Sequence, residues 1–167
     1  MGLTTRNIPV IVLCMSDFDQ QDRRILKELQ RDAGRPVEEL AEVIGLSRNA
    51  TWRRIKRLEE QGVLRGRVAL VDPDALGLGL IVFISVKTDR HDADWAGKFA
   101  AVIRDFPEIL GAYRTAGDQD YLLRARVGDV KAYDSLYQRL IARLELKDVT
   151  ASFVMEEIKE TTELPVA

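Results

Sequence analysis

The chain has 167 residues, of which 46% are apolar and 31% charged, and this composition is typical of a globular protein that can bury a core. No stretch approaches the roughly 18 to 20 apolar residues of a membrane span, and the small-residue cleavage pattern of a secretion signal is missing. The single cysteine, Cys14, excludes an intrachain disulfide and a cysteine-based metal cluster, and it is consistent with a cytoplasmic protein.

The net charge of -2 conceals an uneven distribution of charge along the chain. Residues 48–67 hold seven basic and two acidic side chains, whereas residues 68–167 hold 12 basic and 17 acidic ones. A basic segment attached to an acidic body indicates a polyanionic partner that binds at one end only.

Residues 1–16 are expected to form an N-terminal extension. Met15-Ser-Asp-Phe-Asp resembles a natural start, so residues 1–14 are interpreted as an upstream segment, either disordered or a pairing strand. A helix is expected to begin after Asp19, which is suited to cap it, with Asp22 on the first turn near the positive end of the helix dipole. The apolar stripe of this helix has helical spacing and consists of Ile25, Leu26 and Leu29.

Two helices joined by a tight turn are predicted between Val37 and Gly62. The first spans Val37 to Ile44 and ends at Gly45, because glycine readily adopts the left-handed conformation that ends a helix. Ser47 begins the second helix, where its hydroxyl can accept a hydrogen bond from an unpaired backbone amide. The second helix has one apolar edge and one arginine-rich edge. We therefore interpret the pair as a helix-turn-helix that places its second helix in the major groove of double-stranded DNA.

The candidate DNA contacts all lie on this second helix or at its start: Ser47, Arg48, Asn49, Arg53, Arg54 and Arg57. Arginine binds guanine or phosphate through two donors, and asparagine binds adenine in a similar way. Side chains near the helix start are expected to reach bases, and Arg57, a turn or more later, is expected to meet phosphate. The alternative is an ordinary solvent-exposed helix face with arginine–glutamate pairs, because Arg53, Arg57 and Glu60 lie three to four residues apart. Trp52 is expected to pack against a neighbouring helix.

The helix-turn-helix domain is expected to cover residues 17–66, followed by a linker strand and junction over residues 67–79. Asp72-Pro-Asp74 and the glycines at 77 and 79 mark that junction. Residues 80–167 are expected to form a second domain.

The second domain repeats a strand–helix–strand pattern. Its strands are predicted at Leu80 to Val86, Ile109 to Thr115, Tyr121 to Val127 and Val149 to Ile158, with Met155 in the core. The first helix has an apolar face between Trp95 and Ile103. The expected inner face of the second is Val130, Tyr133, Tyr137, Leu140, Ile141 and Leu144. This order predicts an α+β, ferredoxin-like βαββαβ fold, in which two helices cover one face of a four-stranded antiparallel sheet. Such a sheet leaves its other face uncovered, and a second subunit usually covers it, so we expect a homo-oligomer.

Several short runs occur in an order and spacing that together are highly specific. They include Asp19-Gln-Gln-Asp-Arg-Arg-Ile-Leu26, Gly45-Leu-Ser47, Arg53-Arg-Ile-Lys-Arg-Leu-Glu-Glu-Gln-Gly-Val63, Asp72-Pro-Asp-Ala-Leu-Gly77, Gly117-Asp-Gln-Asp-Tyr-Leu-Leu123 and Ser152-Phe-Val-Met-Glu-Glu-Ile-Lys-Glu-Thr-Thr162. From about Phe18 to Pro165 the chain resembles the Lrp/AsnC, or feast/famine, family of transcription regulators. The resemblance implies a winged-helix-like helix-turn-helix, a C-terminal effector domain, and dimers that pair through their sheets, often four of them in an octamer.

The resemblance also implies a small effector, commonly an amino acid, at the subunit interface. It would lie near Gly117, Asp118, Gln119 and Asp120, whose exposed amides and carboxylates suit the charged ends of an amino acid, with Ser152 offering a hydroxyl. The alternative for the loop is an ordinary hairpin turn. Family members often carry a threonine at the position of Ala151, so the effector is either unusual or absent. We expect no cofactor, no metal ion and no catalytic residue.

Two other functions stay open from the residues alone. Siroheme decarboxylases have a similar architecture and use histidine chemistry at a tetrapyrrole site, whereas this chain has one histidine, His91, in a polar turn. An effector-independent protein that assembles or organises DNA is the other alternative. The expectation is a non-enzymatic, cytoplasmic, sequence-specific transcription regulator.

Overall fold

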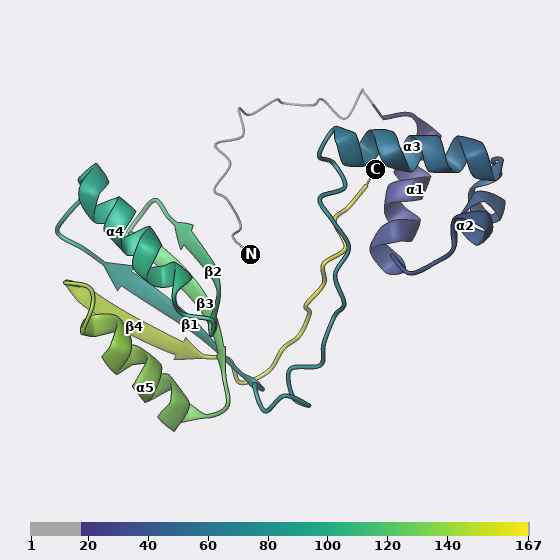
Figure 1. Ribbon diagram of the computed structural model, residues 1–167. Coiled ribbons are helices and arrows are strands. Elements are labelled where there is room, and N and C mark those ends of the chain that lie inside the picture. Colours follow the sequence, from purple (N-terminus) through teal and green to yellow (C-terminus); the bar gives the residue numbers. More distant parts are fainter. Residues whose placement is uncertain (1–17, 167) are drawn as a thin grey trace. The chain divides into compact units, whose positions relative to one another are not determined.

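The computed structural model describes residues 18–166, so the expectation for residues 1–16 lies outside the described part of the chain. Two compact units are present, one helical and one built on a sheet (Figure 1). Among the described residues, the helical unit contains residues 18–69 and 160–166, and the sheet unit is Leu70–Lys159. This division differs from the expected one at the C-terminal end, because the last residues belong with the helices.

The helical unit contains α1 (Gln20–Arg31), α2 (Val37–Ile44) and α3 (Arg48–Glu60). The predicted start of α1 is confirmed: Asp19 caps the helix, and Asp22 completes a capping box with it. The apolar faces of the three helices meet in one core formed by Ile25, Leu26, Leu29, Leu40, Ile44, Ile55 and Leu58. So small a core is marginal by itself, and further chain segments add to it.

The C-terminal segment is one of those additions. The Gln30 side chain donates to the Leu164 carbonyl oxygen at 3.1 Å and accepts from the Leu164 amide at 2.7 Å. Arg31 and Glu163 form an ion pair at 3.3 Å, and Val166 packs against the helical core. The end of the chain is therefore attached to α1.

The strand expected within residues 67–79 is not formed. This stretch has no regular secondary structure, although it is extended before the turn at Pro73. A strand needs a hydrogen-bonded neighbour, and the described residues offer it none.

The sheet unit contains β1 (Leu80–Lys87), α4 (Ala93–Arg104), β2 (Ile109–Arg114), β3 (Tyr121–Val127), α5 (Val130–Ile141) and β4 (Asp148–Phe153). Its strands are antiparallel in the order β2-β3-β1-β4, and both helices cover the same face of the sheet (Figure 1). The predicted ferredoxin-like βαββαβ fold is confirmed. None of the helices within residues 18–166 has the length and apolar character needed to cross a membrane.

The core of this unit lies between the sheet and its two helices. Val82, Ile84 and Val86 of β1 alternate with more exposed residues, as expected for a strand with one covered face. Trp95 and Phe99 of α4 stack at a ring-centroid distance of 5.1 Å, and Leu136 and Leu140 of α5 are buried in the same core.

Three expectations in this unit are wrong. The last strand ends at Phe153 rather than Ile158, because Val154 makes the final bond to β1, at the Ile81 carbonyl oxygen, and the chain then leaves the sheet. Met155 follows that bond and is 96% exposed, so it is not a core residue. Val130 and Ile141 are also exposed, since the inner face of α5 is centred on its fully buried leucines.

The face of the sheet opposite the helices carries exposed apolar side chains. Phe83 of β1 and Tyr113 of β2 are both on it and both exposed. Ser152 lies beside Phe83 on the neighbouring strand β4. This open face is where the sequence predicts a second subunit.

Candidate DNA interface and effector loop

The turn between α2 and α3 has the geometry of a helix-turn-helix. Gly45 ends α2 with a φ of 75°, in the left-handed region that favours glycine. Ser47 caps α3, because its hydroxyl accepts a hydrogen bond from the Ala50 amide at 3.3 Å. Arg24 of α1 donates to the carbonyl oxygens of Val43 and Ile44 at 3.0 and 3.1 Å, which neutralises the free end of α2. These contacts set the direction in which α3 leaves the turn.

A buried carboxylate attaches α3 to the start of α1. Asp22 is 1% exposed and accepts hydrogen bonds from both Arg54, at 2.8 Å, and Arg57. Arg54 also bonds to Asp19 at 2.7 Å. Hydrogen bonds to these carboxylates raise the pKa of the Arg54 guanidinium. The bond from the Asp22 backbone amide, assisted by Arg54, holds the pKa of Asp19 below its usual value. Arg54 and Arg57 thus orient α3 within the helical unit.

The opposite, exposed side of α3 forms what we call the reading face: Asn49, Trp52, Arg53 and Lys56. These positions are three to four residues apart, so they project on the same side of the helix. Within residues 18–166, neither the Asn49 side chain nor the Arg53 side chain has a hydrogen bond or an ion pair, and both are exposed. Lys56 is bonded to Glu59 at 2.7 Å and lies 5.9 Å from the centre of the Trp52 ring.

The expectation that Trp52 packs against another helix is wrong, because its side chain is 51% exposed. The buried residues of α3 are Thr51, Ile55 and Leu58. Trp52 follows Thr51 and therefore lies about 100° further around the helix axis, away from the core. Neither Trp52 nor Lys56 was among the sequence candidates. The sequence signal that could have identified them is their spacing of three and seven residues from Asn49, which puts all three residues on one side of a helix.

The six predicted contacts therefore occupy four different settings. Ser47 is the helix cap, and Arg48 is exposed but paired with Glu38 of α2. Asn49 and Arg53 lie together on the reading face. Arg54 and Arg57 are bound to Asp22, although the Arg57 side chain is still 46% exposed.

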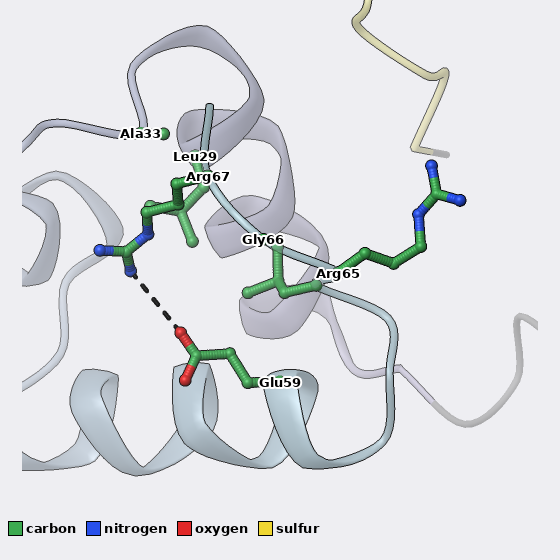
Figure 2. Close-up of a pocket in the computed structure, with 7 residues that line it drawn as sticks. Leu29, Ala33, Glu59, Arg65, Gly66 and Arg67 are labelled. Carbon is green, nitrogen blue, oxygen red and sulfur yellow. Dashed lines mark ion pairs between the residues drawn. The ribbon is translucent and has the colours of Figure 1, made fainter. Parts of the chain in front are cut away.

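A groove of about 510 Å³ lies elsewhere in the helical unit, between the end of α1 and the chain segment that follows α3, residues 64–67, which we call the arm. Its lining residues are Leu29, Ala33, Glu59, Leu64, Arg65, Gly66 and Arg67. Figure 2 shows Arg67 reaching toward Glu59, to which it is paired at 3.9 Å, while Arg65 extends in the other direction. The ion pair attaches the arm to α3. No candidate residue from the sequence lines this groove.

The predicted effector loop connects β2 to β3 and is closed by hydrogen bonds at both ends. The Thr115 amide donates to the Asp120 carbonyl oxygen at 2.9 Å, and the Thr115 hydroxyl donates to the Gln119 carbonyl oxygen at 2.6 Å. Gly117 has a φ of 122°, which an L-residue rarely adopts. The loop leaves Gly117 and Asp118 exposed at its tip.

Asp120 fastens this loop to the end of β1. Its carboxylate accepts a hydrogen bond from the Thr88 amide at 2.9 Å, and its own amide donates to the Val86 carbonyl oxygen at 3.1 Å. The exposed His91 imidazole has its Nδ1 atom 3.9 Å from the same carboxylate. Asp120 is consequently a support of the loop, whereas the Asp118 carboxylate has no bonding partner among the described residues.

The structure does not bring Ser152 to this loop within one chain. Ser152 is paired with Phe83, five residues along β1 from Thr88, which corresponds to roughly 16 Å at about 3.3 Å per residue. Its hydroxyl lies on the open face of the sheet, whereas Ala151 packs against the helix side. A threonine at position 151 would therefore project into the core rather than toward a ligand on the open face.

Both units match known protein families. Residues 18–65 match a winged helix-turn-helix DNA-binding family, and residues 81–164 match the Lrp/AsnC ligand binding domain. The chain is 46% identical to the DNA-binding transcriptional activator DecR of Escherichia coli over 150 residues, which cover 89% of this chain and 99% of DecR.

Solved structures lead to the same family. An AsnC family transcriptional regulator from Agrobacterium tumefaciens is 48% identical, with a TM-score of 0.87 over 89% of this chain and 97% of that one. A transcriptional regulator from Neisseria meningitidis, solved in complex with L-Met, is 38% identical, with a TM-score of 0.84 over 89% of this chain and 96% of that one. The chain therefore belongs to the Lrp/AsnC family of transcription regulators.

Proposed function

We propose that the protein regulates transcription by placing the reading face of α3 in the major groove of double-stranded DNA, under the control of a small effector bound by the sheet unit. Two side chains support this proposal most directly. Asn49 and Arg53 are exposed and have no bonding partner among residues 18–166, and the contacts with Asp22 set the direction of the helix that carries them. Asparagine and arginine are the side chains that bind adenine and guanine through paired hydrogen bonds.

The other predicted DNA residues have supporting roles in this proposal. Arg57 keeps almost half of its surface exposed while bonded to Asp22, so it is held in place to meet a phosphate. Ser47 caps α3 and leaves the remaining first-turn amides at the positive end of the helix dipole, which also suits a phosphate. Arg48 would exchange its exposed contact with Glu38 for one with DNA. Arg54 contributes by fixing α3 to α1.

The test is binding to DNA duplexes that the wild-type protein selects from a random library. Arg53→Gln is expected to weaken binding about tenfold or more, since a base or phosphate contact is lost from a site that keeps its fold. Lys98→Gln, on the exposed side of α4, removes the same charge and serves as the control. Equal affinities of the wild type and Arg53→Gln would contradict the assignment of the reading face.

We further propose that the effector is an amino acid bound near Gly117, Asp118 and Gln119, where the loop tip is exposed and Asp118 can bind the ammonium group. Methionine is the first candidate, because a relative with 38% identity was solved with L-Met. Thermal unfolding with each of the twenty amino acids tests this, and a shift abolished by Asp118→Asn would support the loop. No shift at millimolar concentrations would indicate an effector-independent regulator.

Ser152 would complete that site only from a second subunit, since it lies far from the loop of its own chain. The open face with Phe83 and Tyr113 is the surface through which we propose that two subunits pair. A dimer predicts two DNA half-sites one helical turn, about 34 Å, apart, which footprinting would detect. Light scattering would distinguish a dimer from an octamer. This proposal includes action in the cytoplasm, where a bacterial or archaeal chromosome is accessible.

A further inference from the structure

Trp52 is the one large apolar side chain on the reading face. It is 51% exposed, whereas the second tryptophan of the chain, Trp95, is 3% exposed and stacked in the core of the sheet unit. An indole ring can bury more than 150 Å² of apolar surface, so leaving it in water forgoes a large stabilisation. On a helix side whose other members are polar or basic, this ring is an apolar surface that a partner could cover.

The surroundings of Trp52 show the charge of that partner. The other members of the reading face are Asn49, Arg53 and Lys56, none of which carries a negative charge. The Lys56 ammonium lies 5.9 Å from the centre of the indole ring, within the range of a cation–π contact, and its bond to Glu59 restrains it there. The partner therefore combines negative charge with at least one apolar group.

The major groove of DNA offers that combination at one base only. Thymine presents a C5-methyl group there, while the other base edges present hydrogen-bond donors and acceptors, and phosphates flank the groove. Trp52 is the fifth residue of α3, in the N-terminal half that contacts base edges in helix-turn-helix proteins. Its side chain carries a single donor, so its recognition of DNA rests on apolar contact.

We propose that Trp52 packs against the methyl group of a thymine and thereby specifies an A·T pair at one position of each half-site. This inference rests on the proposed function, because it requires that the reading face enters the major groove. It adds a residue that selects the DNA sequence through an apolar contact, beside Asn49 and Arg53, which would select it through hydrogen bonds.

The experiment replaces thymine by uracil, one position at a time, in a duplex selected by the wild-type protein, and compares three proteins. For the wild type, removing the methyl group at one position is expected to weaken binding about fourfold, the effect of exposing one buried carbon. Trp52→Gln is expected to bind the thymine duplex about tenfold more weakly and to lose nothing further with uracil. Trp52→Phe keeps an apolar ring and is expected to retain most of the response.

Intrinsic fluorescence provides a second readout from the same protein. Acrylamide should quench Trp52 and spare the buried Trp95, and the selected duplex should protect Trp52 from quenching. In Trp52→Phe, where Trp95 is the remaining tryptophan, adding DNA should leave quenching unchanged. Unchanged thermal unfolding of the variants verifies that the exposed position is not needed for folding.

Each contrary outcome overturns the inference in a recognisable way. A Trp52→Gln protein that binds as the wild type, or that still responds to uracil, has no thymine contact. Weakening without any position-specific response to uracil would assign Trp52 to the sugar–phosphate edge, and poor quenching without DNA would assign it to an interface between copies of the chain. If Arg53→Gln weakens binding and Trp52→Gln does not, only this inference fails; if the wild type selects no duplex, the proposed function fails with it.

Discussion

The two sides of α3 carry basic side chains in opposite states. On the side that faces α1, Arg54 and Arg57 are bonded to the buried carboxylate of Asp22. On the reading face, Arg53 is exposed and without a bonding partner in the described part of the chain. Residues 53 and 54 are adjacent and chemically identical, yet the first side chain projects into solvent and the second joins α3 to α1.

This difference shows that one side of a short basic helix can attach it to the domain while the other side stays exposed to a partner. A carboxylate that is removed from water must be bonded to cations or other donors, and two arginines of α3 meet that need for Asp22. The excess of positive charge on residues 48–67 is therefore only partly available to a polyanion. Variants that act on one side of α3 should leave the other side unaffected.

The largest effect is expected from removing the shared acceptor. Asp22→Ala deletes the capping-box partner of α1 and the bonds to both arginines, so the free energy of unfolding should fall by about 3 kcal/mol. Urea unfolding followed by circular dichroism measures the change. Glu60→Ala on the exposed end of α3 is the matched loss of one carboxylate and should cost less than about 0.5 kcal/mol. Similar stabilities of the two variants would show that the Asp22 contacts do not orient α3.

A smaller effect should separate the adjacent arginines. Arg54→Gln breaks the bonds to Asp19 and Asp22 and should lower the free energy of unfolding by about 1 to 1.5 kcal/mol, discounted for the partial exposure of the guanidinium. Arg53→Gln breaks no bond within the described residues and should change stability by less than about 0.5 kcal/mol. Thermal unfolding compares them directly. If Arg53→Gln destabilises the protein as much as Arg54→Gln, the assignment of the two sides is wrong.

The sequence was sufficient to predict the elements that depend on local patterns. The bounds of α2, the cap at Ser47 and the glycine at the turn follow from helix-end chemistry, and the structure confirms all three. The βαββαβ order follows from alternating apolar runs, and the structure confirms it as well. Local signals of this kind need no knowledge of what lies nearby in space.

The sequence could not reveal which arginines of α3 are bound, because Asp22 lies 32 residues before Arg54 and 35 before Arg57. It also could not place Met155, since only the pairing in space shows that the last strand bonds to β1 as far as the Val154 amide and then leaves the sheet. Trp52 was predicted as packed because aromatic side chains usually are. Only the orientation of the helix shows that it projects away from the core.

Arg57 is expected to contribute both to the stability of the helical unit and to DNA binding, because it is bonded to Asp22 and still 46% exposed. Arg57→Gln is expected to weaken binding of the selected duplex about fivefold and to lower the slope of log affinity against log salt by about 1, the value for one phosphate contact. Arg54→Gln should leave that slope unchanged. A wild-type slope for Arg57→Gln would place Arg57 entirely on the structural side of α3.

The smallest expected effect concerns the acid stability of the helical unit. The pKa of Asp19 is held below its usual value by the bond from the Asp22 backbone amide and by Arg54, so the ionised form stabilises the folded state. A lowered folded-state pKa gives stability that is fully present above the ordinary carboxyl range and is lost as the pH falls through the folded-state value. The free energy of unfolding of the wild type should therefore fall more steeply between about pH 6 and about pH 3 than that of Asp19→Asn. Asp118→Asn, in the exposed loop of the sheet unit, should follow the wild-type curve, and an Asp19→Asn curve parallel to both would show that the contact between Asp19 and Arg54 contributes nothing to holding α3.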